Sequence, residues 1–103
     1  MKVIVPGHSY ELSNFEPTPE YRNQALSFIE KSLDERGQFV TVVNGTTNEE
    51  VLKVLIDRIR FLNAKGPCRQ NSIVLTKLEE ALMWLNNRTE ERVARGVENT
   101  PNP

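Results

Sequence analysis

The segment RTEERVARG, residues 88–96, carries three arginines whose spacing suits a single binding surface. Arg88, Arg92 and Arg95 are separated by four and three residues, so in a helix they lie on one stripe, starting one turn beyond Trp84. Guanidinium groups form paired hydrogen bonds with phosphate and carboxylate oxygens, which favours an anion site. The alternative is a basic helix end, which the helix dipole stabilises by only about 0.3–1 kcal/mol.

Residue types that catalyse reactions are sparse. His8 is the only histidine, which excludes a metal site or a dyad built from histidines of one chain. Cys68 has no histidine near it in the sequence to activate it as a nucleophile. The adjacent acids Glu79–Glu80 and Glu90–Glu91 point about 100° apart on a helix, so neither pair can share a proton. The sequence predicts a binding protein rather than an enzyme, with no metal and no cofactor.

The composition is that of one ordinary folded domain, residues 1–103, with 38% hydrophobic and 26% charged residues. A net charge of −1 argues against binding of long nucleic acid, so any anion site must be local. The single cysteine fits a reducing compartment. We expect no membrane span and no secretory signal, because no apolar run is long enough for either.

The residue pattern changes at Asn44–Gly45. Before it, the segments KVIVPG, SYELSNF, ALSFIEK and QFVTVVN are short and rich in β-branched and aromatic residues, which predicts a small antiparallel sheet within residues 1–45. The segment Pro19–Glu35 fits either a strand or a helix, and we predict a strand. Residues 16–22, EPTPEYR, are predicted to form a mobile loop that could fold over a ligand.

Residues 46–96 predict two antiparallel helices joined by a short turn, which makes the fold class α+β. The first helix has Thr47 as its N-cap and Glu50 to complete a capping box, and it ends at Lys65–Gly66. The second helix is predicted to run over residues 67–95, with proline in its first turn.

The helices carry more apolar surface than they can bury against each other. The two facing stripes are Leu52, Leu55, Ile56, Ile59 and Leu62, and Leu75, Leu78, Leu82 and Leu85. The apolar residues outside these stripes are Val51, Val54, Phe61, Ile73, Val74, Met83 and Trp84. Part of this surplus is expected to cover the sheet, and the rest predicts self-association. Residues 97–103 are predicted to be a frayed tail.

Most of the chain resembles a phage protein family. The strings NGTTNEEVLKVLIDRIRFLN and PCRQNSIVLTKLEEALMWLNNRTEERVARGVENT, with YELSNFE and QALSFIEK upstream, resemble the phage Thoeris anti-defence proteins, which sequester the cyclic ADP-ribose signal of bacterial TIR immune enzymes. They also resemble the anti-CBASS cyclic-oligonucleotide sponges, which share the C-terminal helical hairpin. The resemblance implies a non-enzymatic sponge in the host bacterial cytoplasm, built as a homo-oligomer, a dimer or a hexamer. It implies binding of glyco-cyclic ADP-ribose and, in some members, of cyclic di- or trinucleotides in separate pockets.

The resemblance also implies site residues. Phe61 and Asn71 match the signal-binding positions of the family, and Arg88 and Arg92 match its phosphate-contacting arginines. Arg36, in the loop SLDERGQ, is assigned to the same set. These residue types suit such a ligand, because guanidinium groups bind its phosphates, an aromatic face stacks on its base and an amide binds the base edge.

The spacing of these residues limits how they can act together. Asn71 and Arg92 are 21 positions apart on one predicted helix, which is roughly 30 Å. Phe61 lies at the same end of the hairpin as Asn71. If all three contact one ligand, they come from two chains; if not, the two ends of the hairpin mark two sites.

Two further aromatic residues are candidates. Tyr10 and Trp84 are alternative stacking faces, although core packing is the more ordinary role for Trp84. Three alternatives to the favoured sponge stay open: a sponge for cyclic oligonucleotides only, an enzyme that degrades the same nucleotide, and a helical oligomerisation or RNA-binding module.

Overall fold

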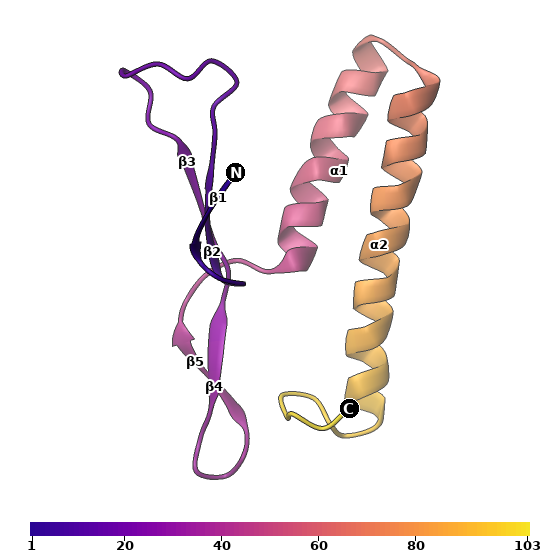
Figure 1. The fold of residues 1–103 in the computed structure, drawn as a ribbon. Helices are drawn as coiled ribbons and strands as arrows, with labels where there is room; N and C mark the ends of the chain where they lie inside the picture. The colour runs from indigo at the N-terminus through magenta and orange to yellow at the C-terminus, as the bar shows by residue number, and fades with distance from the viewer. The chain divides into compact units, whose positions relative to one another are not determined.

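The computed structural model describes residues 1–103 and consists of two compact units, Met1–Thr47 and Asn48–Pro103 (Figure 1). The first unit contains only strands and loops, and the second contains two helices. The α+β class, with antiparallel strands followed by two helices, is therefore confirmed. That the two units form a single domain stays a prediction.

Three short strands of the first unit form an antiparallel sheet in the order β1-β2-β3. The strands β1, β2 and β3 span Lys2–Val5, Ser9–Leu12 and Gln24–Ser27. Tyr10 in the central strand pairs with Val3 on one side and with Leu26 on the other. A tight turn joins β1 to β2, and Gly7 adopts a φ of 78° there, a backbone conformation that suits glycine.

A second, two-stranded sheet follows, built from β4, Glu30–Leu33, and β5, Phe39–Val43. Its turn is organised by Asp34, whose Oδ1 accepts the backbone N–H groups of Arg36 and Gln38, both at 2.9 Å. A side-chain carboxylate that accepts nearby backbone N–H groups is a usual turn device. Arg36 is thereby fixed at the tip of this hairpin.

The predicted strand over Pro19–Glu35 is wrong in its extent, because residues 19–23 are loop and the strand is interrupted at Phe28 and Ile29. There the chain meets Thr46, whose carbonyl accepts the N–H of Ile29 at 2.9 Å. Gly45 allows this approach, since a Cβ at that position would lie 2.5 Å from the carbonyl carbon of Phe28. The expected single sheet is consequently two sheets, separated by this crossing of main chains.

The loop between β2 and β3 contains the residues predicted to form a mobile lid, 16–22. Its base is tied by Asn14, whose Nδ2 donates to the carbonyl of Arg22 at 2.7 Å and whose Oδ1 accepts from Gln24 Nε2 at 3.0 Å. Phe15, next to this tie, is 99% exposed. The lid function of the loop stays a prediction.

The second unit is a hairpin of two antiparallel helices that lie side by side (Figure 1). The helices α1 and α2 span Asn48–Lys65 and Arg69–Ala94. The start of α1 directly after Thr47 agrees with the predicted N-cap position. The predicted start of α2 at Pro67 is two residues early, because Cys68 is the N-cap and its Sγ accepts the N–H of Asn71 at 3.4 Å.

The turn between the helices is closed by Asn63. Its Oδ1 accepts the N–H of Cys68 at 3.0 Å, and its Nδ2 donates to Ser72 Oγ at 3.3 Å. These bonds connect the last turn of α1 to the first turn of α2, so this end of the hairpin is held by polar contacts as well as by the short connection. Neither helix combines the length and the hydropathy that crossing a membrane requires.

The packed interior of the hairpin is very small. Ile56, at 5% exposure, is the only buried residue of the chain. The large apolar side chains exposed on the two helices are Val54, Leu55, Phe61, Leu62, Ile73, Val74, Met83, Trp84 and Val93. Two helices with so little buried apolar area have little hydrophobic stabilisation of their own.

The contrast between Ile56 and Val54 gives a test of this core. We expect Ile56→Ala to lower the free energy of unfolding by about 2–4 kcal/mol, because it leaves a cavity between the helices. Val54→Ala, at a position that is 67% exposed, is the matched control and should cost much less. Chemical denaturation followed by the helical circular dichroism signal measures both. An equal loss for Val54→Ala would mean that another surface covers this face.

Candidate functional site

The three predicted arginines lie on the last turns of α2 and beyond, but they are not equivalent. Arg88 is exposed and has no ion pair or hydrogen bond through its side chain. Arg92 is partly buried, and its Nη2 donates to the carbonyls of Val97 and Thr100 at 3.0 and 2.9 Å. Arg88 is therefore the arginine of this stripe whose guanidinium is open to a ligand.

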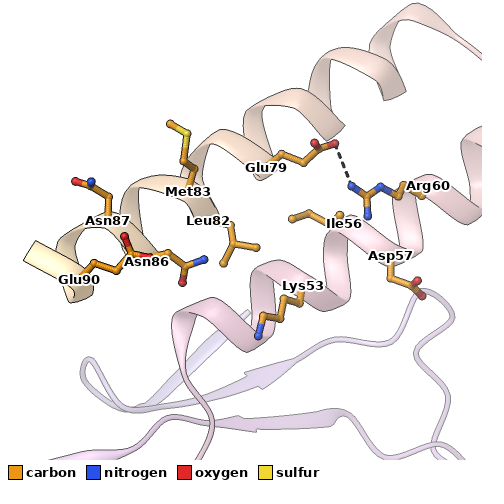
Figure 2. Close-up of a pocket in the computed structure, with 10 residues that line it drawn as sticks. All are labelled: Lys53, Ile56, Asp57, Arg60, Glu79, Leu82, Met83, Asn86, Asn87 and Glu90. Atoms are coloured by element: carbon orange, nitrogen blue, oxygen red, sulfur yellow. Dashed lines mark ion pairs between the residues drawn. The ribbon is translucent and has the colours of Figure 1, made fainter. Parts of the chain in front are cut away.

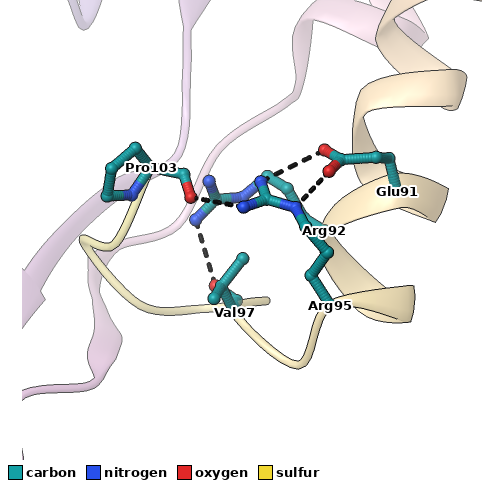
Figure 3. A network of polar contacts seen from close by, with 5 residues as sticks. All are labelled: Glu91, Arg92, Arg95, Val97 and Pro103. Atoms are coloured by element: carbon teal, nitrogen blue, oxygen red, sulfur yellow. Dashed lines mark hydrogen bonds and ion pairs between the residues drawn. The ribbon is translucent and has the colours of Figure 1, made fainter.

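Arg95 is engaged on two sides (Figure 3). Its guanidinium forms an ion pair with Glu91 one turn earlier, and its Nη1 donates to the main-chain oxygen of Pro103 at 2.9 Å. The expectation that residues 97–103 are frayed is wrong, because both Arg92 and Arg95 hold carbonyls of this segment. The charge stripe thus serves in part to fasten the chain that follows the helix.

Phe61 and Asn71 lie together at the opposite end of the hairpin, as predicted, near the turn between the helices. Phe61 is 55% exposed, and Lys65 Nζ lies 4.4 Å from its ring centroid, an attractive cation–π geometry. Asn71 is half-buried in the first turn of α2. This end therefore offers an exposed aromatic ring with a positive charge on one face, and an amide side chain.

The uninterrupted helix α2 keeps the two ends apart. Asn71 and Arg92 belong to the same continuous helix, and 21 residues of α-helix span about 30 Å. The structure thus brings Phe61 and Asn71 to one end and Arg88 and Arg92 to the other. One small nucleotide cannot reach both sets within a single chain.

The other two predicted residues lie in the β-rich unit. Tyr10 is half-buried, and its ring meets that of Phe28 edge to face, with centroids 6.0 Å apart and planes at 84°. This contact gives Tyr10 a packing role within its own unit. Arg36 is exposed at the tip of the β4–β5 hairpin.

Trp84 differs from the expectation of core packing, because its side chain is 61% exposed. It borders a shallow hollow on α2 together with Thr76, Glu80 and Met83. The sequence pattern missed this, since a tryptophan flanked by leucines on a helix ordinarily belongs to the packed face. Trp84 is therefore available to a ligand or to another chain.

A groove between α1 and α2, which is not among the predicted sites, has a volume of about 650 Å³ (Figure 2). Arg60 and Glu79 approach each other across it, with Nη2 and Oε1 3.5 Å apart. The residues that line it are Lys53, Ile56, Asp57, Arg60, Glu79, Leu82, Met83, Asn86, Asn87 and Glu90. Three carboxylates against two cations make it a poor site for a phosphate.

The sequence did contain a signal for this groove. Lys53, Asp57 and Arg60 have helical spacing beside the apolar stripe of α1, and Glu79, Asn86 and Glu90 have such spacing along α2. None of the predicted site residues lines the groove. The groove and the predicted sites are thus separate features of the hairpin.

Comparison with known proteins agrees with the hairpin architecture. The sequence model of the family described as "Acb2/Tad1, hairpin domain" matches residues 27–90, a segment that contains Arg36, Phe61, Asn71 and Arg88 and ends two residues before Arg92. Among curated proteins, "Thoeris anti-defense 1" of Bacillus phage SBSphiJ7 is 53% identical to this chain over 58 residues.

Those 58 residues make up 55% of this chain and 41% of that relative, so the match spans less than half of the relative's length. The family model matches a longer part of this chain than the curated relative does. Its match begins at the end of β3 and continues through β4, β5, α1 and most of α2. It covers more than half of the chain, which therefore belongs to the Acb2/Tad1 hairpin-domain family.

Proposed function

We propose that this chain is a phage anti-defence protein that binds a cyclic nucleotide immune signal inside the infected host cell and retains it without degrading it. The observation that carries the proposal is the match of residues 27–90 to the Acb2/Tad1 hairpin domain. The similarity to a phage protein named for Thoeris anti-defence supports the same role. Binding of glyco-cyclic ADP-ribose, and of cyclic di- or trinucleotides, is part of this proposal.

The accessible side chains at each end of the hairpin suit the phosphates and the bases of such ligands. Arg88 offers an unpaired guanidinium, which forms strong paired hydrogen bonds with phosphate oxygens. Phe61 offers an exposed ring for stacking on a base. Asn71 offers both a donor and an acceptor for the edge of a base.

The exposed apolar residues support the assembly that this function needs. One hairpin buries only Ile56 and leaves nine large apolar side chains exposed on its helices, among them Leu55, Leu62 and Val74. A homo-oligomer, a dimer or a hexamer, would cover such surface and gain the hydrophobic free energy that the single chain lacks. It would also let residues from the two ends of different chains meet at one ligand.

Binding of the nucleotide without its degradation is favoured because the chain lacks the side-chain groups that usually catalyse hydrolysis. The chain has no group of three or more histidine, cysteine, aspartate or glutamate side chains close enough to hold a metal ion. Its only histidine, His8, lies in the β-rich unit with Glu30 Oε1 4.0 Å from its Nε2. A nucleophile activated by a base, which covalent hydrolysis needs, is not formed by the groups at either end of the hairpin.

A first test is calorimetric titration of the purified protein with glyco-cyclic ADP-ribose isomers and a panel of cyclic di- and trinucleotides. We expect nanomolar binding of at least one of them, followed by recovery of the intact ligand on denaturation and chromatography. Recovery of an altered nucleotide would indicate an enzyme. No binding across the panel would mean that the hairpin serves assembly alone, and binding of RNA with strong salt dependence would favour the nucleic-acid alternative.

A second test addresses the role of Arg88. If its guanidinium grips a phosphate through two donors, both Arg88→Ala and Arg88→Lys should weaken binding of a cyclic trinucleotide, the alanine variant by about 10-fold to 100-fold. Lys77→Ala, an exposed cation three turns earlier on α2, is the matched control and should change little. Unchanged binding by Arg88→Lys would instead indicate that only the positive charge matters, as for a cation that stabilises the helix C-terminus.

A third test asks whether the two ends of the hairpin hold different ligands. Phe61→Ala and Asn71→Ala are expected to abolish binding of glyco-cyclic ADP-ribose, while cyclic trinucleotide binding is retained, because these side chains lie about 30 Å from the arginine end of the same chain. Competition titration with both ligands measures this directly. Loss of both ligands in each variant would point to one site shared between two chains.

A further inference from the structure

The segment after α2 turns back onto the helix end (Figure 3). Gly96 adopts a φ of 72°, and the N–H of Val97 donates to the carbonyl of Arg92 at 3.0 Å, which is the usual way a glycine-terminated helix ends. A second turn follows, in which Thr100 donates both its N–H and its hydroxyl to the carbonyl of Val97, at 3.2 and 2.6 Å. We call residues 97–103 the strap.

The strap occupies the guanidinium of Arg92. The Nη2 group of Arg92 donates to the carbonyls of Val97, at 3.0 Å, and Thr100, at 2.9 Å, and all three residues are partly buried. A guanidinium can grip a phosphate along either of two edges, Nη1 with Nη2 or Nε with Nη2. Both edges include Nη2, so while the strap is bound Arg92 has no complete edge left for a phosphate.

The two carbonyl oxygens therefore stand where phosphate oxygens would bind. Arg88 precedes Arg92 by one helical turn, on the same side of α2, and its own side chain is open. The two guanidinium groups would form a paired phosphate site only when the strap has left Arg92. In the strapped state this site consists of one arginine.

We propose that the strap is an internal competitor for the phosphate site at Arg88 and Arg92, and that an anionic ligand binds in this site by displacing it from Arg92. This inference rests on the proposed function, because it concerns the same arginines. The apparent affinity for the ligand is then the intrinsic affinity multiplied by the fraction of molecules whose strap is open. The strap thus raises the ligand concentration that half-saturates this end of the hairpin.

Asn99 offers a way to open the strap without changing any residue of α2 or either arginine. It is the one residue other than glycine with a positive φ, at 60°, and it lies inside the turn from Val97 to Thr100. Asparagine and glycine tolerate this conformation, whereas a β-branched residue does not. Asn99→Ile should therefore open the turn, and Asn99→Gly is the matched control that loses the same side chain but keeps the allowed backbone conformation.

The experiment is calorimetric titration of the full chain and its variants with cyclic triadenylate and with glyco-cyclic ADP-ribose. We expect Asn99→Ile to bind the ligand that depends on Arg92 about threefold to tenfold more tightly than Asn99→Gly, because both variants lose the asparagine side chain and only isoleucine disfavours the turn. In an Arg92→Ala background, Asn99→Ile should have no effect. Amide hydrogen exchange of Thr100 should speed up in Asn99→Ile and also when the unchanged chain is saturated with that ligand.

The outcomes separate the strap from the proposed function. If Asn99→Ile leaves Arg92-dependent binding unchanged, the strap does not compete with the ligand. The same conclusion follows if the Thr100 amide stays protected in the complex. Either result would overturn the strap proposal without contradicting the proposed function. Weaker binding in Asn99→Ile would mean that the strap orients Arg92 rather than competing for it, which also overturns the proposal. No binding of either ligand by any variant would overturn both the strap and the proposed site.

Discussion

The continuity of α2 is the constraint on which the rest of the hairpin depends. The helix runs without a break over 26 residues, from Arg69 to Ala94, which is about 39 Å at 1.5 Å per residue. It fixes Asn71 near the turn to α1 and Arg92 at the far end, and no side-chain motion can bring them together. Any ligand chemistry is therefore divided between two ends of one rigid element, and the hairpin can unite these ends only through a second chain.

The same element leaves little to hold a single chain together. Ile56 of α1 is the only buried residue of the chain, while Leu55, Leu62 and Val74 are exposed. The polar bonds of Asn63 join the two helices at the turn, whereas at the other end the strap is bonded to α2 alone. The hairpin is therefore held together by polar contacts and a small core. Surface that is apolar and uncovered is what an assembling protein requires, which connects the thin core to the proposed oligomer.

The features that follow local rules were predictable from the sequence. The start of α1 after Thr47, its end at Lys65 and the antiparallel hairpin follow from caps, a glycine and leucine periodicity. The division of the strands into two sheets was not predictable, because it depends on the contact between Phe28 and Thr46, residues 18 positions apart. The exposure of Trp84 was missed for a related reason, since helical periodicity shows which residues share a face but not whether anything covers it.

The arginine stripe shows where spacing stops being informative. Arg88, Arg92 and Arg95 are equivalent by sequence pattern, yet in the structure one is open, one holds two carbonyls and one is paired with Glu91. The bonds of Arg92 depend on Gly96 and Asn99, whose positive φ values turn the chain back onto the helix, whereas the Arg95–Glu91 pair is an ordinary contact between residues one helical turn apart. A tail with proline and asparagine resembles a frayed end in composition, but these residues also favour tight turns, and a guanidinium within reach of the resulting carbonyls is enough to hold them. Whether a terminal arginine binds a ligand is therefore decided by the backbone that follows it as much as by the helix that carries it.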